Sequence, residues 1–396
     1  MRLSYVIVTH NRRESLLRTL DILHRTTPLA PHDWEAWVVD NASTDGSIEA
    51  VQARYPRVQI IRCPSNEGVG ARSLAFARAA GEYLVLLDDD SYPVGDAVTR
   101  SMDYMDLYRD VAAVVGRVVL PDGSLEACAM PSVMLSGAVC FRRSVAVSHG
   151  RFRPEFFRKA GEYDVSFRLW QAGYRVERFE DVVYRHDKVM SGRCRAFAHR
   201  MDLRNNLILC ARYLPQPWRD VYWQDWSHRY RAIARADGCG WSAAQAMIEA
   251  RWWSIREALA GRQVLSESVI ETIFEHRRQA GRVGDWAVGE RIGRVLIADY
   301  AKTLHATWRA CRQADLDIVG IADNGRAFAG MDYRGTPIAA DADWQSQRID
   351  GIVVANINPA QIERRIASLR SWFAGPILRL WEPRYLSSML PSRLAA

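Results

Sequence analysis

Residues 83–92 read YLVLLDDDSY, an apolar run that ends in three consecutive aspartates. The apolar part has the length and composition of a buried strand. Three like charges side by side repel one another, and a buried strand has no structural use for them. The stretch therefore predicts that something is bound where this strand ends.

This stretch is the last of four expected strands, which alternate with helices. The expected strands span residues 3–9, 35–40, 58–64 and 82–90. The expected helices span residues 13–26, 44–55 and 68–80, the second of them with Thr44 as its N-cap. Alternation of helices with continuously apolar strands indicates an α/β fold in which a mostly parallel sheet is sandwiched by helices.

Each expected strand is followed by a short polar cluster. The clusters read THN from Thr9, DNAST from Asp40, SNEG from Ser65 and DDD from Asp88. Ligands of such sheets bind outside the carboxyl ends of the strands. Ordinary polar loops would also explain the clusters, but short acidic and amide side chains at all four ends favour a binding site.

The rest of the chain predicts further structural units. A hairpin is expected around residues 120–125, and a helix from Glu162 to a stop at Gly173. Residues 191–290 are rich in Arg and Trp and helical in pattern, and residues 291–383 return to alternating strands and helices. We expect three parts: residues 1–214, a helical segment at 215–290, and a smaller α/β domain at 291–396.

Aromatic residues gather near the start of the helical segment. They are Trp218, Tyr222, Trp223, Trp226 and Tyr230. Aromatic residues at helical spacing usually form a core, which is the interpretation that we favour. The alternative is an aromatic and basic face against a lipid headgroup layer.

Composition limits the class of protein. The 396 residues include 53 Lys and Arg against 46 Asp and Glu, and the net charge of +7 favours anionic partners such as nucleotides or phospholipid surfaces. Seven scattered cysteines without a CxxC pair predict neither disulfides nor a zinc site. No apolar run approaches the roughly 20 residues of a membrane helix, and the N-terminus lacks a signal-peptide core. We therefore expect a cytoplasmic protein.

Several motifs, in this order and spacing, resemble those of family 2 glycosyltransferases, which have the GT-A fold. They are VIVTHNR from Val6, VVDNASTDGS from Val38, NEGVGARS from Asn66, LLDDDSYP from Leu86, GEYDVSFRLWQAGY from Gly161, the His of VYRH, and RNNLILCARYLP, which ends at residue 215. The resemblance implies a GT-A sheet in residues 1–214. It also implies inverting transfer of a sugar from a UDP-, dTDP- or GDP-sugar to an acceptor hydroxyl. We expect no nucleic-acid partner, and a glycan, a lipid-linked molecule and a small molecule all stay open as acceptors.

The same resemblance implies a divalent metal, Mn²⁺ or Mg²⁺. Asp88 and Asp90 match the family's DxD motif, and His186 would complete the metal site. On an extended chain Asp88 and Asp90 point to one side, whereas Asp89 points away, toward the sugar or toward bracing groups. Oxygen ligands suit both ions, and a cation that bridges the donor phosphates neutralises the leaving group. An acidic turn that only caps the next helix is the alternative.

The resemblance also assigns residues that bind the donor. They are Thr9, Asn11, Asp40, Asn66, Gly68, Arg72, Asp88 and Asp89. Asp40 would accept hydrogen bonds from the base and ribose, whose N–H and O–H groups are donors. Gly68 would let the backbone approach the ligand closely. Arg72 would meet a phosphate or lie beside the base.

Glu162 is the expected catalytic base. A single displacement needs a carboxylate that takes the proton of the acceptor hydroxyl. The family carries Glu-Asp at this place, whereas this chain carries Gly161-Glu162, so the base would be a glutamate. Asp164 is the alternative base. A third interpretation is that Glu162 only favours the helix dipole as an N-terminal acid.

Residues 291–396 resemble small Rossmann-like sugar or nucleotide sensor domains. The stretches IVGIADN, YRGTPIA and IDGIVVAN carry this resemblance, but the first turn reads ADYAK, without the glycines that let backbone approach a pyrophosphate. We therefore expect a structural, dimerising or acceptor-handling domain. A nucleotidyltransferase and a non-catalytic nucleotide-sugar sensing scaffold stay open as alternatives. A homodimer, and a peripheral contact of the Arg- and Trp-rich segment with the inner membrane face, also stay open.

Overall fold

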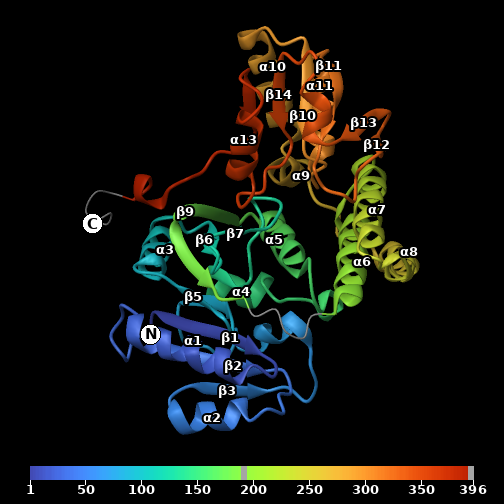
Figure 1. Cartoon of the computed structure of the whole chain (residues 1–396). Coiled ribbons are helices and arrows are strands. Elements are labelled where there is room, and N and C mark those ends of the chain that lie inside the picture. The colour runs from blue at the N-terminus through green and yellow to red at the C-terminus, as the bar shows by residue number, and fades with distance from the viewer. Residues whose placement is uncertain (189–193, 391–396) are drawn as a thin grey trace. The chain divides into compact units, whose positions relative to one another are not determined.

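The structure is a computed structural model that describes residues 1–188 and 194–390. The chain divides into two compact units. The first comprises Met1–Cys128, Ser132–Gly192 and Pro383–Ala396, and the second comprises Ala129–Pro131 and Arg193–Glu382. Each unit contains a sheet flanked by helices (Figure 1).

The sheet of the first unit confirms the expected α/β class. Its strands are β1 (Leu3–Thr9), β2 (Trp34–Asp40), β3 (Gln59–Arg62), β4 (Tyr83–Asp88), β5 (Ser91–Pro93), β6 (Val111–Val119), β7 (Leu125–Glu126), β8 (Ala138–Arg142) and β9 (Arg175–His186). They lie in the order β3-β2-β1-β4-β8-β6-β9-β5, with β7 paired to β6. Pairing is parallel from β3 to β4, whereas β8 runs antiparallel to both β4 and β6. The carboxyl ends of β3, β2, β1 and β4 therefore meet at one edge.

Helices cover both faces of this sheet. They are α1 (Arg13–Thr26), α2 (Ser47–Arg54), α3 (Ala97–Leu107), α4 (Arg143–His149), α5 (Gly161–Gln171) and the short 3₁₀ helices η1 (Gly68–Leu74), η2 (Pro154–Phe156) and η3 (Leu386–Ser388). Successive residues of β1 enter different cores: Tyr5 and Ile7 pack with Leu20 of α1, whereas Val6 packs with Phe76. Two buried faces explain why β1 and β4 are continuously apolar.

Two expected elements of this region are different in the structure. The helix expected at residues 68–80 is the 3₁₀ helix η1, which ends at Leu74. Gly68 adopts a φ of 67°, and a Cβ there would lie 2.1 Å from the carbonyl oxygen of Phe157, so a regular helix cannot start at this residue. The helix expected from Thr44 begins at Ser47, because Gly46 (φ 74°) takes the N-cap position and the Thr44 N–H donates to Asn11 instead.

The second unit begins with helices and ends with a smaller sheet. Its helices are α6 (Arg195–Tyr213), α7 (Trp218–Ala236), α8 (Gly240–Ala260), α9 (Glu267–Phe274), α10 (His276–Glu290), α11 (Leu304–Gln313), α12 (Asp341–Trp344) and α13 (Ile362–Arg370). Its strands are β10 (Arg294–Ala298), β11 (Asp317–Ala322), β12 (Asp332–Tyr333), β13 (Thr336–Ala339), β14 (Gly351–Val354) and β15 (Ile377–Arg379). The order is β12-β13-β11-β10-β14-β15, and only the β12–β13 pair among them is antiparallel.

The division of the chain differs from the expected boundaries at residues 214 and 290. Helix α6 belongs to the second unit, where Arg212 pairs with Glu257 of α8 at 2.6 Å. Lys302, after β10, donates to Asn206 of α6 at 2.5 Å, which joins the helices to the small sheet. In the other direction, the chain beyond Pro383 returns to the first unit, where the Leu386 N–H donates to Asp181 of β9.

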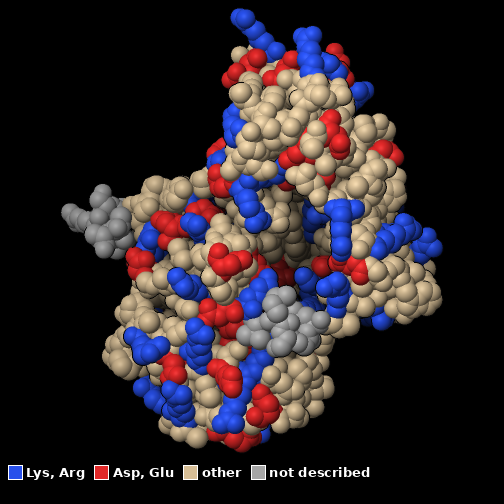
Figure 2. All heavy atoms as spheres, in the orientation of Figure 1, with Lys and Arg blue, Asp and Glu red and all other residues tan. Residues whose placement is uncertain are grey.

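Two further expectations concern the surface. Tyr222 and Trp226 are buried, as the interpretation of the aromatic cluster as core requires. Among residues 1–188 and 194–390, no helix is long and apolar enough to cross a membrane. Acidic and basic side chains are interspersed over the visible face of each unit, rather than gathered in a single basic field (Figure 2).

Candidate metal and donor site

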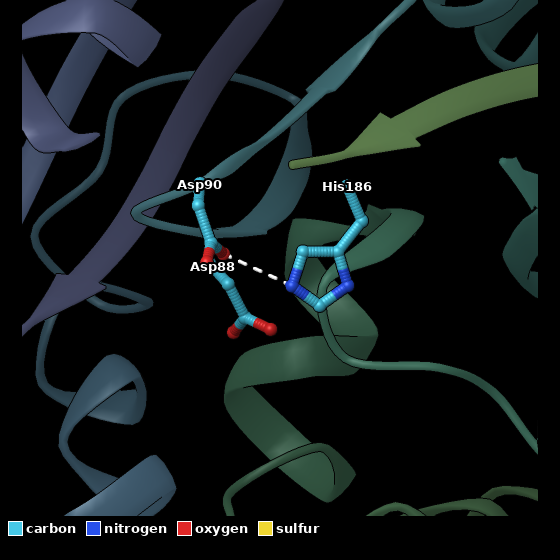
Figure 3. Close-up of side chains that lie close together, drawn as sticks. All are labelled: Asp88, Asp90 and His186. Carbon is cyan, nitrogen blue, oxygen red and sulfur yellow. Dashed lines mark ion pairs between the residues drawn. The ribbon is translucent and has the colours of Figure 1, made fainter. Parts of the chain in front are cut away.

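The three aspartates form an acidic turn between β4 and β5. Asp88 is the last residue of β4, Asp89 and Asp90 make the turn, and Ser91 begins β5. Because β5 pairs with β9, Ser91 lies opposite His186. Asp88, Asp90 and His186 each offer one ligand atom, and these atoms lie within 4.8 Å of one another. Figure 3 shows the two carboxylates and the imidazole turned toward a common point.

Asp90 is the most constrained member of this group. Its Oδ2 accepts from the Arg12 guanidinium at 2.8 Å, and its Oδ1 lies 3.0 Å from His186 Nε2 (Figure 3). The other imidazole nitrogen, Nδ1, lies 2.7 Å from Glu126. Burial lowers the pKa of His186, but hydrogen bonds to Asp90 and Glu126 outweigh it and raise the pKa to about 10. His186 is therefore held between two carboxylates.

Glu126 supports His186 from the β6–β7 hairpin. Burial raises its pKa, yet the contacts with His186 and with Lys188, at 3.0 Å, bring the pKa down to about 2. A carboxylate on the far nitrogen of a metal-binding histidine fixes the orientation of the ring. Glu126 has this relation to His186.

Asp89 turns away from the other two aspartates. It accepts from Thr9 Oγ1 at 2.8 Å and lies 3.4 Å from Arg12. Burial raises the pKa of Asp89 to about 7, although Arg12 and Thr9 oppose the rise. Thr19 of α1 donates to its carbonyl oxygen. Asp89 therefore braces the turn against β1 and α1.

Asp88 is anchored from the opposite side. Arg72, which is fully buried, donates to its Oδ1 at 2.9 Å and also to the carbonyl oxygen of Ser136. A Cβ at Gly137 would lie 2.7 Å from Asp88 Oδ2, so only glycine permits this approach. The Asp88 side chain is 39 % exposed, which leaves it open to a ligand.

Ser136 also connects the acidic turn to Glu162. Its hydroxyl donates to Glu162 Oε1 at 2.8 Å, while its carbonyl accepts from Arg72. Glu162 is half-buried in the first turn of α5. Asp164, two residues on, is fully buried and pairs with Arg168 at 2.9 Å and with Arg153 at 3.7 Å.

The remaining expected donor residues lie in the loops after β1, β2 and β3. Thr9 pairs in register with Asp40, whose Oδ1 accepts from the Ser43 N–H at 3.0 Å. Asn11 is exposed, has a φ of 52° and accepts from Thr44. Asn66 is exposed and accepts from the Gly68 N–H at 2.9 Å.

Gly68 and Arg72 are packed closely against other parts of the protein. Gly68 lies against the Phe157 backbone, and the neighbouring Val69 N–H donates to the Phe157 carbonyl at 3.0 Å. Arg72 has no exposed surface and is held by Asp88 and by the carbonyls of Val69 and Ser136. Both residues therefore position the loop after β3 and the acidic turn.

The acidic turn and His186 fit a divalent cation. Two carboxylate oxygens and one imidazole nitrogen are a donor set that suits Mn²⁺, and the carboxylates also suit Mg²⁺. The ligand atoms come from β4, the turn and β9, which are held by the sheet rather than by a free loop. Arg12, Asn41, Glu126 and Ser136 were not expected from the sequence. Asn41 joins two of the loops, since its Nδ2 donates to the Gly68 carbonyl at 2.8 Å and its Oδ1 accepts from Glu67.

Comparison with known proteins gives the relationship of the first unit. Residues 4–130 match glycosyl transferase family 2. The match contains the polar ends of β1, β2, β3 and β4 and the hairpin that carries Glu126. The resemblance expected from the motifs is therefore confirmed for this part of the chain.

Curated relatives of this family 2 region match it over short stretches. A poly(ribitol-phosphate) beta-glucosyltransferase of Bacillus spizizenii is 33 % identical over 105 residues, which are 25 % of this chain and 16 % of that protein. An uncharacterized glycosyltransferase, YwdF, of Bacillus subtilis is 36 % identical over 95 residues, 23 % of this chain and 34 % of that protein. The chain therefore spans well under half of the length of either relative.

A solved structure supports the GT-A fold. S. aureus TarS 1-349 in complex with UDP-GlcNAc matches 85 % of this chain and 98 % of that chain, with a TM-score of 0.50 and 16 % identity. At this identity the likeness concerns the fold alone.

Proposed function

We propose that this protein is a metal-dependent, inverting glycosyltransferase that moves a sugar from a nucleotide-diphospho-sugar to an acceptor hydroxyl. One observation carries the proposal: Asp88, Asp90 and His186 converge, and Ser136 and Gly137 join this group to Glu162. A cation site and a half-buried carboxylate side by side are what a displacement at a sugar diphosphate needs.

In this proposal Asp88, Asp90 and His186 hold Mn²⁺ or Mg²⁺. The cation, when bound, stabilises the negative charge of the departing diphosphate. Asp90 and His186 fix the site, because each is tied to a second charged group, Arg12 or Glu126. Asp88 is the more open ligand, since 39 % of its side chain is exposed.

Glu162 is the proposed base. One of its oxygens accepts from Ser136 Oγ, which orients the carboxylate and leaves the second oxygen to accept the proton of the acceptor hydroxyl. Asp164 is a poorer candidate, because its charge is buried and neutralised by Arg168 and Arg153. The pairing pattern thus favours Glu162 as the base and Asp164 as a brace for α5.

The nucleoside is proposed to lie over the ends of β1, β2 and β3. Asp40, Asn11 and Asn66 are the proposed contacts. Thr9, Asp89, Gly68 and Arg72, which we expected to touch the donor, are proposed instead as supports. Thr9 and Asp89 bond to each other, Arg72 is fully buried, and Gly68 lies against the Phe157 backbone.

Release of the nucleoside diphosphate tests this proposal. Purified protein would be incubated with Mn²⁺ or Mg²⁺ and a panel of UDP-, dTDP- and GDP-sugars, with and without glycan acceptors. UDP-sugars come first, since the TarS structure named above contains UDP-GlcNAc. We expect slow donor hydrolysis that needs the metal and that Glu162→Gln slows by about 10²–10⁴-fold. Nucleoside diphosphate release that is equal in wild type and Glu162→Gln would refute the role of Glu162.

A further inference from the structure

A cavity of about 610 Å³ opens in the second unit. It lies beyond the carboxyl ends of β10, β11 and β14, where it is lined by Asp299, Asp323 and Asn356. The strand order turns at β10, with β11 and β13 on one side and β14 and β15 on the other. Open α/β sheets bind ligands at this topological position, and the volume is typical of small-molecule sites.

Both acidic groups at the cavity have partners within the protein, Asp299 an arginine and Asp323 backbone N–H groups. Asp299 accepts from Arg365 at 2.6 Å and from Asn356 at 3.0 Å. Asp323 accepts from the backbone N–H groups of Tyr300 and Gly325, at 2.8 and 2.7 Å. Asp299 also has a φ of 72°, a conformation that a residue with a side chain keeps only where its surroundings enforce it. These contacts make a rigid wall.

Two arginines at the cavity are not neutralised. Nε and Nη1 of Arg229 are buried without a hydrogen-bond partner in the described part of the chain, and its guanidinium lies 5.2 Å from the centre of the Phe328 ring. Arg364, in the first turn of α13, is exposed and has no ion-pair partner among the described residues. Buried N–H groups without an acceptor are rare and costly. Because Arg229 and Arg364 both line the cavity, their guanidinium groups give it positive charge that suits an anion.

We propose that this cavity binds a small organic phosphate that carries hydroxyl groups, such as a sugar phosphate. Arg229 and Arg364 contact the phosphate, and Asp299 and Asp323 accept hydrogen bonds from the hydroxyls. The first turn, from Asp299 to Lys302, has no glycine, so backbone cannot cradle a pyrophosphate, and guanidinium groups replace it. A phosphate site here differs from the structural, dimerising or acceptor-handling role that we expected for this domain, and it is independent of the proposed transferase activity.

Calorimetry on the full chain in EDTA tests this site, with glucose 1-phosphate, inorganic phosphate and glucose as probes. We expect glucose 1-phosphate to bind more tightly than inorganic phosphate, and glucose not to bind. Arg229→Gln and Arg364→Gln should each weaken binding by about tenfold or more, as loss of a charged hydrogen bond does. Arg370→Gln, on the exposed end of α13, is the matched control.

The proposal is overturned if glucose 1-phosphate does not bind. It is also overturned if Arg229→Gln and Arg364→Gln both bind glucose 1-phosphate as tightly as the wild type does. Arg364 is exposed, so its variant keeps the test open should Arg229→Gln not fold. Asp90→Ala, which removes a proposed metal ligand in the first unit, should leave glucose 1-phosphate binding unchanged.

A separate observation concerns α8, which presents large apolar side chains to solvent. The outer face of α8 comprises Trp241, Ile248, Trp252, Ile255 and Leu259, which are between 56 % and 84 % exposed. Their spacing of seven, four, three and four residues places them along one side of the helix. Contiguous exposed apolar residues of this kind mark an interaction surface.

The charges of α8 are divided between its two sides. Glu249 pairs with Arg200, and Glu257 pairs with Arg212, so both acidic residues of the helix turn toward α6. Arg251 and Arg256 are exposed. Arg256 lies 5.6 Å from the centre of the Trp252 ring, which places a cation on the outer face. This face is therefore apolar and basic, with no acidic residue of α8 on it.

We infer that the outer face of α8 docks on a membrane surface that contains anionic lipid. Trp and aliphatic side chains enter the boundary between headgroups and acyl chains, and Arg251 and Arg256 pair with anionic headgroups. A second copy of the chain is a poorer occupant, because two such faces bring arginines together without an acidic partner on α8.

Vesicle co-sedimentation of the full chain tests this inference. We expect binding to phosphatidylcholine vesicles that contain phosphatidylglycerol, little binding to phosphatidylcholine alone, and weakening by salt. Trp252→Ser and the double variant Arg251→Gln/Arg256→Gln should each lower the partition coefficient by about tenfold or more. Val288→Ser, an isolated exposed residue of α10, should not. Failure to bind the anionic vesicles, or a dimer in light scattering that Trp252→Ser dissociates, would overturn the inference.

Discussion

Both sheets of this protein place carboxylates at the carboxyl ends of parallel strands. In the first unit Asp40 ends β2 and Asp88 ends β4; in the second, Asp299 follows β10 and Asp323 follows β11. The surroundings differ. Asp88 and Asp90 share a point with His186, whereas Asp299 is paired with Arg365, and Asp323 is bound by backbone N–H groups.

Carboxylates at the ends of parallel strands therefore do not by themselves decide whether a site suits a cation or an anion. At the acidic turn Arg12 binds Asp90 and Arg72 binds Asp88. The potential ligand atoms of Asp88, Asp90 and His186 still lie close to one another. In the second unit Asp299 and Asp323 have partners within the protein, whereas Nε and Nη1 of Arg229 are buried without an acceptor among the described residues. The first edge is suited to a cation and the second to an anion.

Asp90→Ala should have the largest effect on this contrast. It removes a proposed metal ligand and leaves Arg12 and His186 without their shared carboxylate. We expect metal-dependent binding of UDP to fall by more than about a hundredfold. Asp96→Ala, a mostly exposed acid beside α3, is the control for calorimetry with Mn²⁺. Unchanged UDP binding by Asp90→Ala would contradict the proposal that Asp90 is a metal ligand.

Glu162→Gln should affect turnover and spare binding. The amide keeps the contact with Ser136 but cannot take a proton, so we expect turnover to fall by about 10²–10⁴-fold. The measurements are nucleoside diphosphate release and UDP affinity. Equal loss of binding and turnover in Glu162→Gln would contradict the division of roles.

Asp164→Asn should instead lower the stability of the protein by about 3–5 kcal/mol, because it leaves Arg168 and Arg153 facing a neutral group.

Arg365→Gln tests the second sheet. It leaves Asp299 and Asp341 without their common cation, and we expect a loss of about 3–5 kcal/mol in the stability of the second unit. Chemical denaturation of the full chain measures this loss, and Arg370→Gln serves as the exposed control. UDP binding with Mn²⁺ should not change. A parallel loss of UDP binding would mean that the two sheets are not independent.

The last expected effect is a dependence on pH. The pKa of His186 is raised from 6.5 to about 10, so its protonation stabilises the fold fully below pH 6.5, and this contribution is lost as pH rises toward 10. In EDTA the melting temperature should therefore fall over this window, less so in His186→Gln. Mn²⁺ affinity should rise over the same window, because the metal competes with the proton. His32→Gln, which is exposed, is the control.

A flat melting temperature for wild type between pH 6.5 and 10 would contradict the contacts of His186 with Asp90 and Glu126. Asp89, whose pKa is raised from 3.8 to about 7, lowers stability as the pH rises from 3.8 to 7, which lies mostly below this window.

The sequence predicted the strands and their polar ends because both follow from local pattern. Apolar runs of strand length predicted β1, β2 and β4. The resemblance to family 2 motifs, rather than local pattern, predicted that Asp88, Asp90 and His186 would converge. Arg12 and Glu126 were not predictable in this way. They reach Asp90 and His186 from 78 and 60 residues away in the chain, so only the assembled sheet brings them together.

Gly68 and Arg72 show a different limit. A glycine and an arginine in a loop at a strand end are equally compatible with contact to a ligand and with contact to the protein. The choice depends on the Phe157 backbone and on Ser136, which lie far along the chain. The sequence also did not predict that one face of α8 is exposed. Apolar residues at helical spacing usually form a core, and only the packing of α8 against α6 shows which face is exposed to solvent.

The most direct test of the central claim is calorimetric titration of the full chain with UDP, dTDP and GDP, each with Mn²⁺, with Mg²⁺ and with EDTA. The account predicts that at least one nucleoside diphosphate binds with the metal, that EDTA abolishes this binding, and that Asp90→Ala does the same. Absence of binding for all three nucleotides with both metals would contradict it.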